Sequence, residues 1–169
     1  MPVDLARITE PCNAPFSKEG LTFVNNCDYD GVGAMFKHII PNQTEKPLVP
    51  RDLDWQNWGT ISEFDQNEFA EKSAAMDNSG YVFVPHACNS NNSACKVHVA
   101  FHGCHQSKNS LEARNMPGSA YAENTGYLEW AGTNEIIVLF PQVLPLYKDL
   151  NWIGCWDVWG YTGQDNLTN

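Results

Sequence analysis

The stretch Lys96-Val-His-Val-Ala-Phe-His-Gly-Cys-His-Gln-Ser107 decides the fold of this chain. Val97 and Val99 belong to a short apolar run of residues that favour β-structure, which predicts a strand over 96–101. His102-Gly-Cys-His-Gln106 then ends the run as a tight polar turn, and a helix is expected to follow. In α/β enzymes, a buried strand that ends in a glycine turn before a helix directs backbone N–H groups toward a ligand. We therefore interpret the turn as half of an oxyanion hole.

Two further apolar runs predict the strands that accompany this one. Gly80-Tyr-Val-Phe-Val-Pro85 is predicted to be a strand adjacent to 96–101. Ile136-Ile-Val-Leu-Phe140 is a continuous apolar run, which is typical of a buried parallel strand. A weaker alternation over 61–69 indicates one more strand. Strand, turn, helix and strand make a right-handed βαβ unit, so we expect an α/β fold with roughly three to four strands.

Two helices are predicted from the spacing of apolar residues. One covers 31–40 and ends before Pro41, because its apolar residues fall on one helical face: Val32, Met35, Phe36 and Ile39. The other covers about 119–131 and stops at Gly132. Both helices are expected to pack against the predicted strands.

The length and composition indicate one globular domain, or a large part of one, over 1–169, and they exclude several kinds of partner. The chain has 169 residues, of which 43% are apolar, and a net charge of −10. Lys and Arg are scattered, without a basic stripe, so nucleic acid is not an expected partner. No apolar run reaches the length of about 18 residues that a membrane span requires. The first residues have no basic region followed by an apolar core, so they are not a signal peptide.

Six cysteines point to an oxidising compartment. None is in a CxxC motif, and six cysteines allow many pairings. Proximity suggests Cys12 with Cys27 and Cys88 with Cys95, which leaves Cys104 with Cys155. Three glycosylation-type sequons also fit a secreted chain: Asn42, Asn91 and Asn166. A missing N-terminal portion would reconcile export with the absent signal peptide.

Several clusters have a second chemical interpretation. His98, His102, Cys104 and His105 are zinc-capable, although strand rise places His98 and His102 roughly 13 Å apart. Cys104 is also a candidate thiol nucleophile that His105 or His102 would activate, provided that it is not in a disulfide. The Asn25–Gly31 run is rich in Asn and Asp, but it lacks the spacing of an EF-hand calcium loop.

Carboxylates and tryptophans form further clusters. A solvated face explains the acidic residues Glu63, Asp65, Glu68 and Glu71 better than acid–base chemistry does. Trp55 and Trp58 are either a polymer-stacking platform or packing beneath a loop, and we favour packing. The stretch 151–161 contains three tryptophans and a tyrosine, which is either a ligand site or a packed aromatic lid.

A serine hydrolase needs a Gly-x-Ser-x-Gly elbow between a strand and a helix, and this chain has none. What the chain does have is the other half of that machinery. His102-Gly-Cys104 occupies the place of the His-Gly-Gly loop of lipases, whose backbone N–H stabilises a developing oxyanion.

Two cysteine-bearing motifs resemble the extracellular poly(3-hydroxybutyrate) depolymerases of the circularly permuted α/β-hydrolase type. They are Phe101-His-Gly-Cys-His-Gln106 and Gly154-Cys-Trp-Asp-Val-Trp-Gly-Tyr161. Shorter matches lie at Asn25–Gly31 followed by Ala34–Ile39, at Glu63–Gln66 and at Val138–Gln142. The resemblance runs over most of 11–162, and it implies a partial, circularly permuted α/β-hydrolase sheet with long disulfide-pinned loops.

The resemblance implies the last part of a secreted carboxylic ester hydrolase. The catalytic serine, aspartate and histidine of the family have no matching positions here, so the isolated chain is expected to be inactive. Cys104 matches the oxyanion residue, which acts through its backbone N–H, and its side chain would pair with Cys155. Trp156 and Trp159 match the aromatic substrate crevice, in which Val158 departs from the family's tryptophan.

The same resemblance implies an ester or polyester substrate, no metal or organic cofactor, and a partner in the missing N-terminal portion of the hydrolase. A second class of function remains open. In that reading the chain is a non-catalytic polymer- or carbohydrate-binding module that uses its tryptophans: Trp55, Trp58, Trp156 and Trp159.

Overall fold

The computed structural model describes residues 10–12, 24–40, 47–70, 75–90, 94–146, 151–157 and 160–162. Within these residues the main sheet has four strands in the order β3-β4-β6-β5. Their bounds are Gly59–Asp65 for β3, Ser79–Pro85 for β4, Lys96–Val99 for β5 and Ile136–Phe140 for β6. β4 is antiparallel to β3 and β6, whereas β5 and β6 are parallel. The predicted α/β class with about four strands is confirmed.

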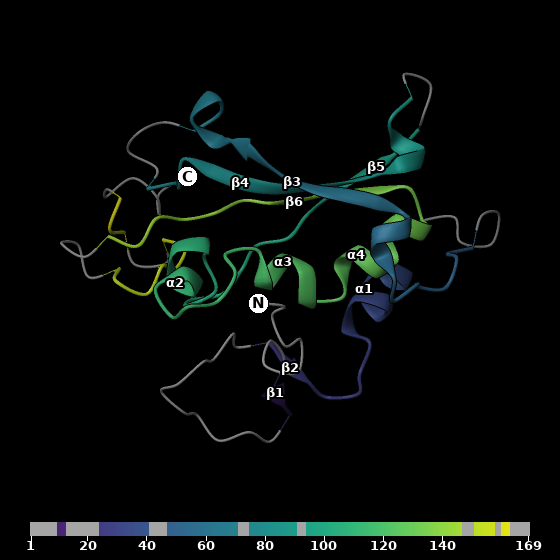
Figure 1. Ribbon diagram of the computed structural model, residues 1–169, viewed down its shortest axis with the longest axis horizontal. Helices are drawn as coiled ribbons and strands as arrows, with labels where there is room; N and C mark the ends of the chain where they lie inside the picture. The colour runs from purple at the N-terminus through teal and green to yellow at the C-terminus, as the bar shows by residue number, and fades with distance from the viewer. Residues whose placement is uncertain are drawn as a thin grey trace.

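The α-helices lie on one face of this sheet, as Figure 1 shows. They are α1 (Gly31–Ile39), α2 (Lys108–Glu112), α3 (Ala120–Asn124) and α4 (Tyr127–Thr133). Short 3-10 helices follow at η2 (Trp55–Asn57), η3 (Gln66–Glu68) and η5 (His86–Cys88). A two-stranded parallel sheet pairs β1 (Glu10–Pro11) with β2 (Asn25–Asn26). None of the described helices is both long and apolar enough to cross a bilayer.

The predicted strands are present, but one predicted pairing is wrong. β5 was expected beside β4, and β6 lies between them. The chain leaves β5 through α2, α3 and α4, and it returns as the most apolar strand of the sheet. A continuous apolar run is stabilised best at a central position with a neighbour on each edge. β5 consequently becomes an edge strand, and it ends at Val99 rather than at residue 101.

The predicted helix over 119–131 is two helices, because Gly126 interrupts it. Gly126 has φ 87°, a left-handed conformation that glycine adopts without steric cost. The predicted helix over 31–40 corresponds to α1, which buries Phe36 while Ile39 remains 49% exposed. The weak strand predicted over 61–69 is β3, and the chain turns into η3 after Asp65.

The hydrophobic core lies between the helices and the face of the sheet that they cover. The side chains of Phe83, Val138 and Phe140 point into it and are fully buried. Leu128 and Trp130 of α4 pack on the same cluster. Alternate residues of a strand face opposite sides, so this one face accounts for every second residue of β4 and β6.

The three predicted disulfides are all present: Cys12–Cys27, Cys88–Cys95 and Cys104–Cys155. The first lies next to the β1–β2 pair, and the second closes the loop between η5 and β5. The third joins the turn after β5 to the aromatic segment 151–157. Three disulfides in one chain fit an oxidising compartment.

Candidate functional site

The turn after β5 is a fixed hydrogen-bonded turn over Gly103–Gln106. The Gln106 N–H donates to the Gly103 carbonyl at 3.2 Å, and His105 has φ 67°. A positive φ at the third position of a turn is the mark of type II, which histidine adopts less readily than glycine. The Gly103 N–H donates to Gln106 Oε1 at 2.7 Å. Hydrogen bonds within the turn therefore satisfy the Gly103 N–H, the Gly103 carbonyl and the Gln106 N–H.

The Cys104 backbone N–H stands apart from these bonds. It donates to no residue that the structure describes, and Cys104 is exposed. Its side chain is held by the disulfide to Cys155. The turn thus carries, on an exposed residue after the carboxyl end of β5, an N–H that donates to no described residue.

The segment 151–157 is held firmly against this turn. Asn151 is fully buried, and its side chain accepts from the Cys155 N–H at 2.7 Å and donates to the Cys155 carbonyl at 2.9 Å. The His105 N–H donates to the Ile153 carbonyl at 2.7 Å. A Cβ at Gly154 would lie 2.5 Å from Ser107 Oγ, so glycine permits the close approach. Covalent and hydrogen bonds together fix the two segments.

Trp156 lies directly beside the turn. Its Nε1 donates to the His102 carbonyl at 2.8 Å, and its ring centre is 4.9 Å from that of Phe101. Phe101 is 59% exposed, so the two rings form an accessible aromatic surface next to the turn. Tyr121 Oη supports Phe101 by donating to its carbonyl at 2.9 Å. The other predicted crevice residue, Trp159, lies outside the described residues.

The zinc interpretation is not supported within the described residues. They contain no group of three or more metal-capable side chains. His102 is buried, its Nδ1 lies 2.8 Å from the Gly103 carbonyl, and its Nε2 accepts from the Val143 N–H. Burial lowers the pKa of His102. His102 is therefore a neutral histidine that holds the turn to the chain after β6.

The thiol interpretation is wrong. Cys104 is in a disulfide, and the chain has no free cysteine. A thiolate is the nucleophile in cysteine chemistry, so no cysteine here can fill that role.

The acidic run before α1 has a structural role instead of a calcium site. Asp30 caps α1 by accepting from the Gly33 N–H at 2.8 Å, and it also accepts from Trp130 Nε1 at 2.9 Å. Farther along the chain, Glu63 pairs with Lys108 at 2.7 Å and remains half exposed. Glu71 lies outside the described residues.

Of the first tryptophan pair, Trp55 packs against the core, whereas Trp58 is exposed. Trp55 contacts Phe83 edge-on, with ring centres 5.9 Å apart. Trp58 is 41% exposed, its Nε1 donates to Asp52 at 2.9 Å, and it covers Gly132 of α4. Trp55 is thus a core residue, and Trp58 is a partly exposed cover.

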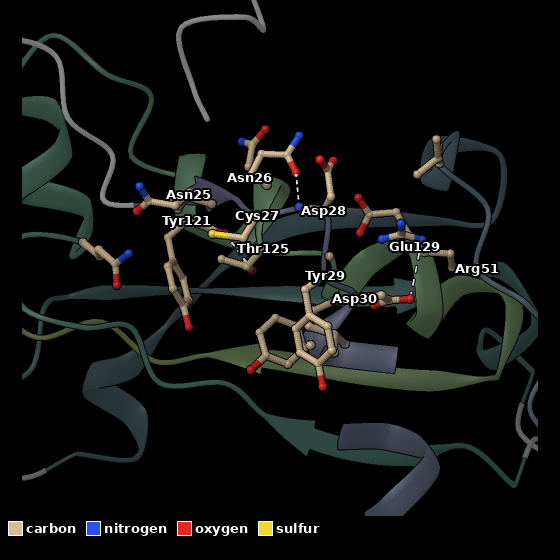
Figure 2. A pocket seen from close by; sticks show the side chains of 18 residues that line it. Asn25, Asn26, Cys27, Asp28, Tyr29, Asp30, Arg51, Tyr121, Thr125 and Glu129 are labelled. Atoms are coloured by element: carbon tan, nitrogen blue, oxygen red, sulfur yellow. Dashed lines mark hydrogen bonds and ion pairs between the residues drawn. The ribbon is translucent and has the colours of Figure 1, made fainter. Parts of the chain in front are cut away.

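A cavity of about 750 Å³ lies on the helix side of the sheet, and nothing in the sequence pattern indicated it. Figure 2 shows its side chains converging from the segment before α1 and from the helices α3 and α4. The lining is largely polar and includes Asp28, Arg51 and Glu129, and Gln106 connects it to the turn. Burial raises the pKa of Glu129, whose Oε2 has no hydrogen-bond partner among the described residues.

A buried pair of glutamines was also missed, although both occur in the short family matches. Gln66 Nε2 donates to the Gln142 carbonyl at 2.9 Å, and the Gln142 N–H donates to Gln66 Oε1 at 2.9 Å. Gln142 Oε1 accepts from the Lys108 N–H at 2.7 Å, which fixes the start of α2. A glutamine directly after a buried strand was the available signal.

The mixed sheet, with helices between its parallel strands, makes this an α/β protein. Over most of its length the chain is similar to part of the polyhydroxybutyrate (PHB) depolymerases. It is 36% identical to a polyhydroxybutyrate depolymerase of Talaromyces funiculosus, over 85% of this chain and 41% of that protein. It is 33% identical to a poly(3-hydroxybutyrate) depolymerase of Delftia acidovorans, over 92% of this chain and 28% of that protein.

Solved structures give the same result. A PHB depolymerase from Penicillium funiculosum matches with a TM-score of 0.70 and 33% identity, over 94% of this chain and 50% of that one. A serine-to-alanine variant of a PHB depolymerase, complexed with an R3HB trimer, matches with the same TM-score over 92% of this chain and 49% of that one. The chain therefore spans half or less of the length of these relatives. No protein-family model matches it.

Proposed function

We propose that this chain is part of a secreted carboxylic ester hydrolase of the PHB depolymerase kind, one incomplete domain of a circularly permuted α/β-hydrolase. It supplies an oxyanion donor and an aromatic substrate crevice to a catalytic serine, aspartate and histidine that lie outside 1–169. The observation that carries the proposal is the Cys104 N–H, which donates to no described residue and belongs to a disulfide-bonded turn after β5 beside Trp156.

The chemistry follows from the position of that N–H. Attack on an ester carbonyl places negative charge on its oxygen, and a preorganised donor stabilises that charge. The disulfide and the bonds to segment 151–157 hold the donor in place before substrate arrives, so no reorganisation is needed. Phe101 and Trp156 offer apolar surface to the methyl-bearing chain of a polyester, and Trp159 is proposed to extend it. The reaction needs no metal and no organic cofactor.

The isolated chain is expected to hydrolyse neither p-nitrophenyl butyrate nor PHB. A fluorophosphonate probe, which labels activated serines, should leave it unlabelled. Labelling of a serine within 1–169 would contradict the assignment of the nucleophile to another stretch of protein.

The oxyanion role is tested in a chimera that carries this chain in place of the matched stretch of the Talaromyces funiculosus depolymerase. The variant C104P/C155A removes the N–H, and the variant C104A/C155A loses the disulfide but keeps the N–H. Proline is compatible with the second position of a type II turn, so the backbone is retained. We expect kcat to fall roughly 100- to 1,000-fold between the alanine and proline variants, with KM little changed. Equal rates for the two variants would remove the oxyanion role.

The alternative function, a non-catalytic polymer-binding module, has one observation in its favour. Phe101, which contacts Trp156, is 59% exposed, and Trp152, which contacts His105, is 62% exposed, so aromatic side chains around the turn are accessible. Retention of the isolated chain on PHB granules, lost in W156A and kept in W58A, would favour this function. Retention on polysaccharide instead would indicate a carbohydrate ligand.

A further inference from the structure

Two buried glutamine side chains connect the ends of the strands to the segment that carries the Cys104 N–H. Gln66 follows β3 and Gln142 follows β6, and they are 3% and 2% exposed. A buried amide is costly unless each of its polar groups finds a partner. Once all of those groups are satisfied, the amide holds its neighbours in one arrangement. The partners of these two side chains therefore show which segments they fix.

The Gln66 amide bonds to the main chain of Gln142 as a neighbouring antiparallel strand would. Its Oε1 accepts from the Gln142 N–H at 2.9 Å, and its Nε2 donates to the Gln142 carbonyl at 2.9 Å. Nε2 also donates to the Asp77 carbonyl at 2.7 Å. A Cβ at Gly80 would lie 2.7 Å from Gln66 Oε1, so glycine on β4 leaves room for this amide. The main chain of Gln142 is thus fixed to the chain after β3 and to the chain before β4.

The Gln142 side chain extends that constraint to the start of α2. Its Nε2 donates to the Phe140 carbonyl at 3.2 Å, and its Oε1 accepts from the Lys108 N–H at 2.7 Å. Lys108 is the first residue of α2 and lies four residues after Cys104. The side chain of Gln142 therefore links the end of β6 to the far end of the segment that carries the Cys104 N–H.

Val143 holds the near end of the same segment. Its N–H donates at 3.4 Å to Nε2 of His102, which lies two residues before Cys104. Consecutive residues after β6 thus bind both ends of the segment 102–108. The segment 151–157 binds its middle through the disulfide of Cys104. The turn is therefore held from two sides, by the chain after β6 and by 151–157.

We propose that Gln142 and Gln66 are positioning residues for ester hydrolysis. Gln142 sets where the Cys104 N–H lies relative to the ester oxygen, and Gln66 holds Gln142 in place. The inference rests on the proposed function and adds two residues to it. Both side chains are buried with their amides bonded within the chain, so they act through the turn and not on substrate. A donor to a developing charge must be held within about 0.5 Å of its productive position, and supporting hydrogen bonds behind it secure that position.

The first test uses the chimera that carries this chain in place of the matched stretch of the Talaromyces funiculosus depolymerase. Q142M keeps the length of the side chain but removes the acceptor for the Lys108 N–H. We expect it to lower kcat roughly 10- to 100-fold and to change KM less than about twofold, because a displaced donor loses transition-state stabilisation and not substrate binding. Q66M leaves the Lys108 bond in place and should lower kcat roughly 3- to 10-fold.

The matched control is N134L, which also removes a buried bond between an amide and a distant main chain. The Asn134 side chain accepts from the Val49 N–H at 2.8 Å and donates to the Val49 carbonyl at 2.9 Å. Asn134 precedes β6, so it lies at the opposite end of that strand from Gln142. We expect N134L to keep kcat within about twofold of the parent chimera. A loss equal to that of Q142M would mean that both act through stability alone, and it would overturn the positioning role.

The Cys104 variants show whether Gln142 acts through the N–H. In C104A/C155A, which keeps that N–H, Q142M should lower kcat by about tenfold or more. In C104P/C155A the same change should lower kcat less than about twofold, because no N–H remains at residue 104 to be positioned. Equal losses in the two backgrounds would overturn the proposal.

Hydrogen exchange in the full chain tests the same contacts without any activity. In Q142M the amides of His105 and Gln106 should exchange about tenfold or more faster than in the parent chain, together with the amide of Lys108. Faster exchange confined to Lys108 and the rest of α2 would mean that Gln142 only caps this helix. That result would overturn the positioning role.

These readouts separate this inference from the proposed function. If the proline variant lowers kcat and Q142M does not, the oxyanion role stands and the positioning role is overturned. If the chimera hydrolyses no ester, the proposed function fails, and hydrogen exchange still decides whether Gln142 holds the turn.

Discussion

The two faces of the four-stranded sheet carry similar side chains in opposite surroundings. Phe83 and Val138 lie on the face that the α-helices cover and are fully buried, whereas Val97 and Val99, on the opposite or open face, are 61% and 41% exposed. Hydrophobic stabilisation follows the apolar area removed from water. We therefore expect the covered face to contribute most of the hydrophobic stabilisation of this chain, and the open face to contribute less.

A carboxylate introduced on each face in turn should give the largest difference in the free energy of unfolding. Ile136 and Ile137 are neighbours in β6, and Ile136 is 1% exposed on the covered face while Ile137 lies on the open face. We expect I136D to lower the free energy of unfolding by about 5 kcal/mol or more, because it places an unpaired carboxylate in the core. I137D should cost about 1 kcal/mol, since its carboxylate reaches water. Urea unfolding followed by circular dichroism measures both, and similar losses would mean that both faces are covered.

The disulfide at the end of β5 should have the next largest effect. Within the described residues β5 has a single strand neighbour, and Cys104–Cys155 ties the turn after β5 to the segment 151–157 across a separation of 51 residues. The disulfide restricts the conformations of the unfolded chain. Its removal in C104S/C155S should therefore lower the free energy of unfolding by about 4 kcal/mol.

The second disulfide is the control for that effect. Cys88–Cys95 closes only 7 residues, so C88S/C95S should cost about 2 kcal/mol. Thermal unfolding of both double variants compares them. A smaller loss at Cys104–Cys155 than at Cys88–Cys95 would mean that the hydrogen bonds of segment 151–157 alone anchor the edge strand.

Loss of the N-terminal cap of α1 should destabilise the helical layer less than loss of the Cys104–Cys155 disulfide destabilises the chain. Asp30 caps α1 and also accepts from Trp130 Nε1 of α4, so it joins two of the covering helices. We expect D30A to cost about 1 to 2 kcal/mol, through the lost cap and the unsatisfied indole N–H. D30N retains a capping acceptor and should cost less than half as much. Equal losses would show that charge, through Arg51 at 3.6 Å, matters more than capping.

The comparison of the two faces also explains which features were predictable. Strand positions follow local composition, and the apolar run Ile136–Phe140 coincides with β6. The neighbours of a strand depend on contacts far apart in the sequence, so the position of β6 between β4 and β5 was not evident from either segment. Gly126 alone does not predict a helix break, because glycine is tolerated within helices at modest cost. The break lies at Gly126, whose left-handed backbone separates α3 from α4.

For the candidate site, chemistry was more predictable than shape. The pairing of Cys104 with Cys155 and the nearness of Trp156 to the turn were expected from motifs, and the disulfide is confirmed. The Cys104 oxyanion role and the Trp156 crevice role stay predictions. The cavity beside α3 and α4 had no signal, because its lining comes from segments separated by up to about a hundred residues, such as Asp28 and Glu129. A cavity is a property of the packed chain, and no single motif encodes it.

The smallest predicted effect concerns Glu129 in that cavity, on the covered side of the sheet. Burial raises its pKa, and its Oε2 has no partner, so the folded chain holds the proton more tightly than the unfolded chain does. The folded state therefore binds more protons than the unfolded state above the ordinary glutamate pKa, and stability falls as pH rises through that range. Below the ordinary pKa both states are protonated, and Glu129 has no effect of this kind.

The substitution E129Q removes this charge while keeping the shape of the side chain. We expect it to raise the free energy of unfolding at pH 7 by up to about 1 kcal/mol, and to change it little near pH 3.5. E112Q is the matched control, because Glu112 lies in α2 outside the cavity lining. Urea unfolding at the two pH values measures both variants. A gain for E129Q that is equal at pH 3.5 and pH 7 would mean that packing, and not the buried charge, limits the stability of the helix layer at this cavity.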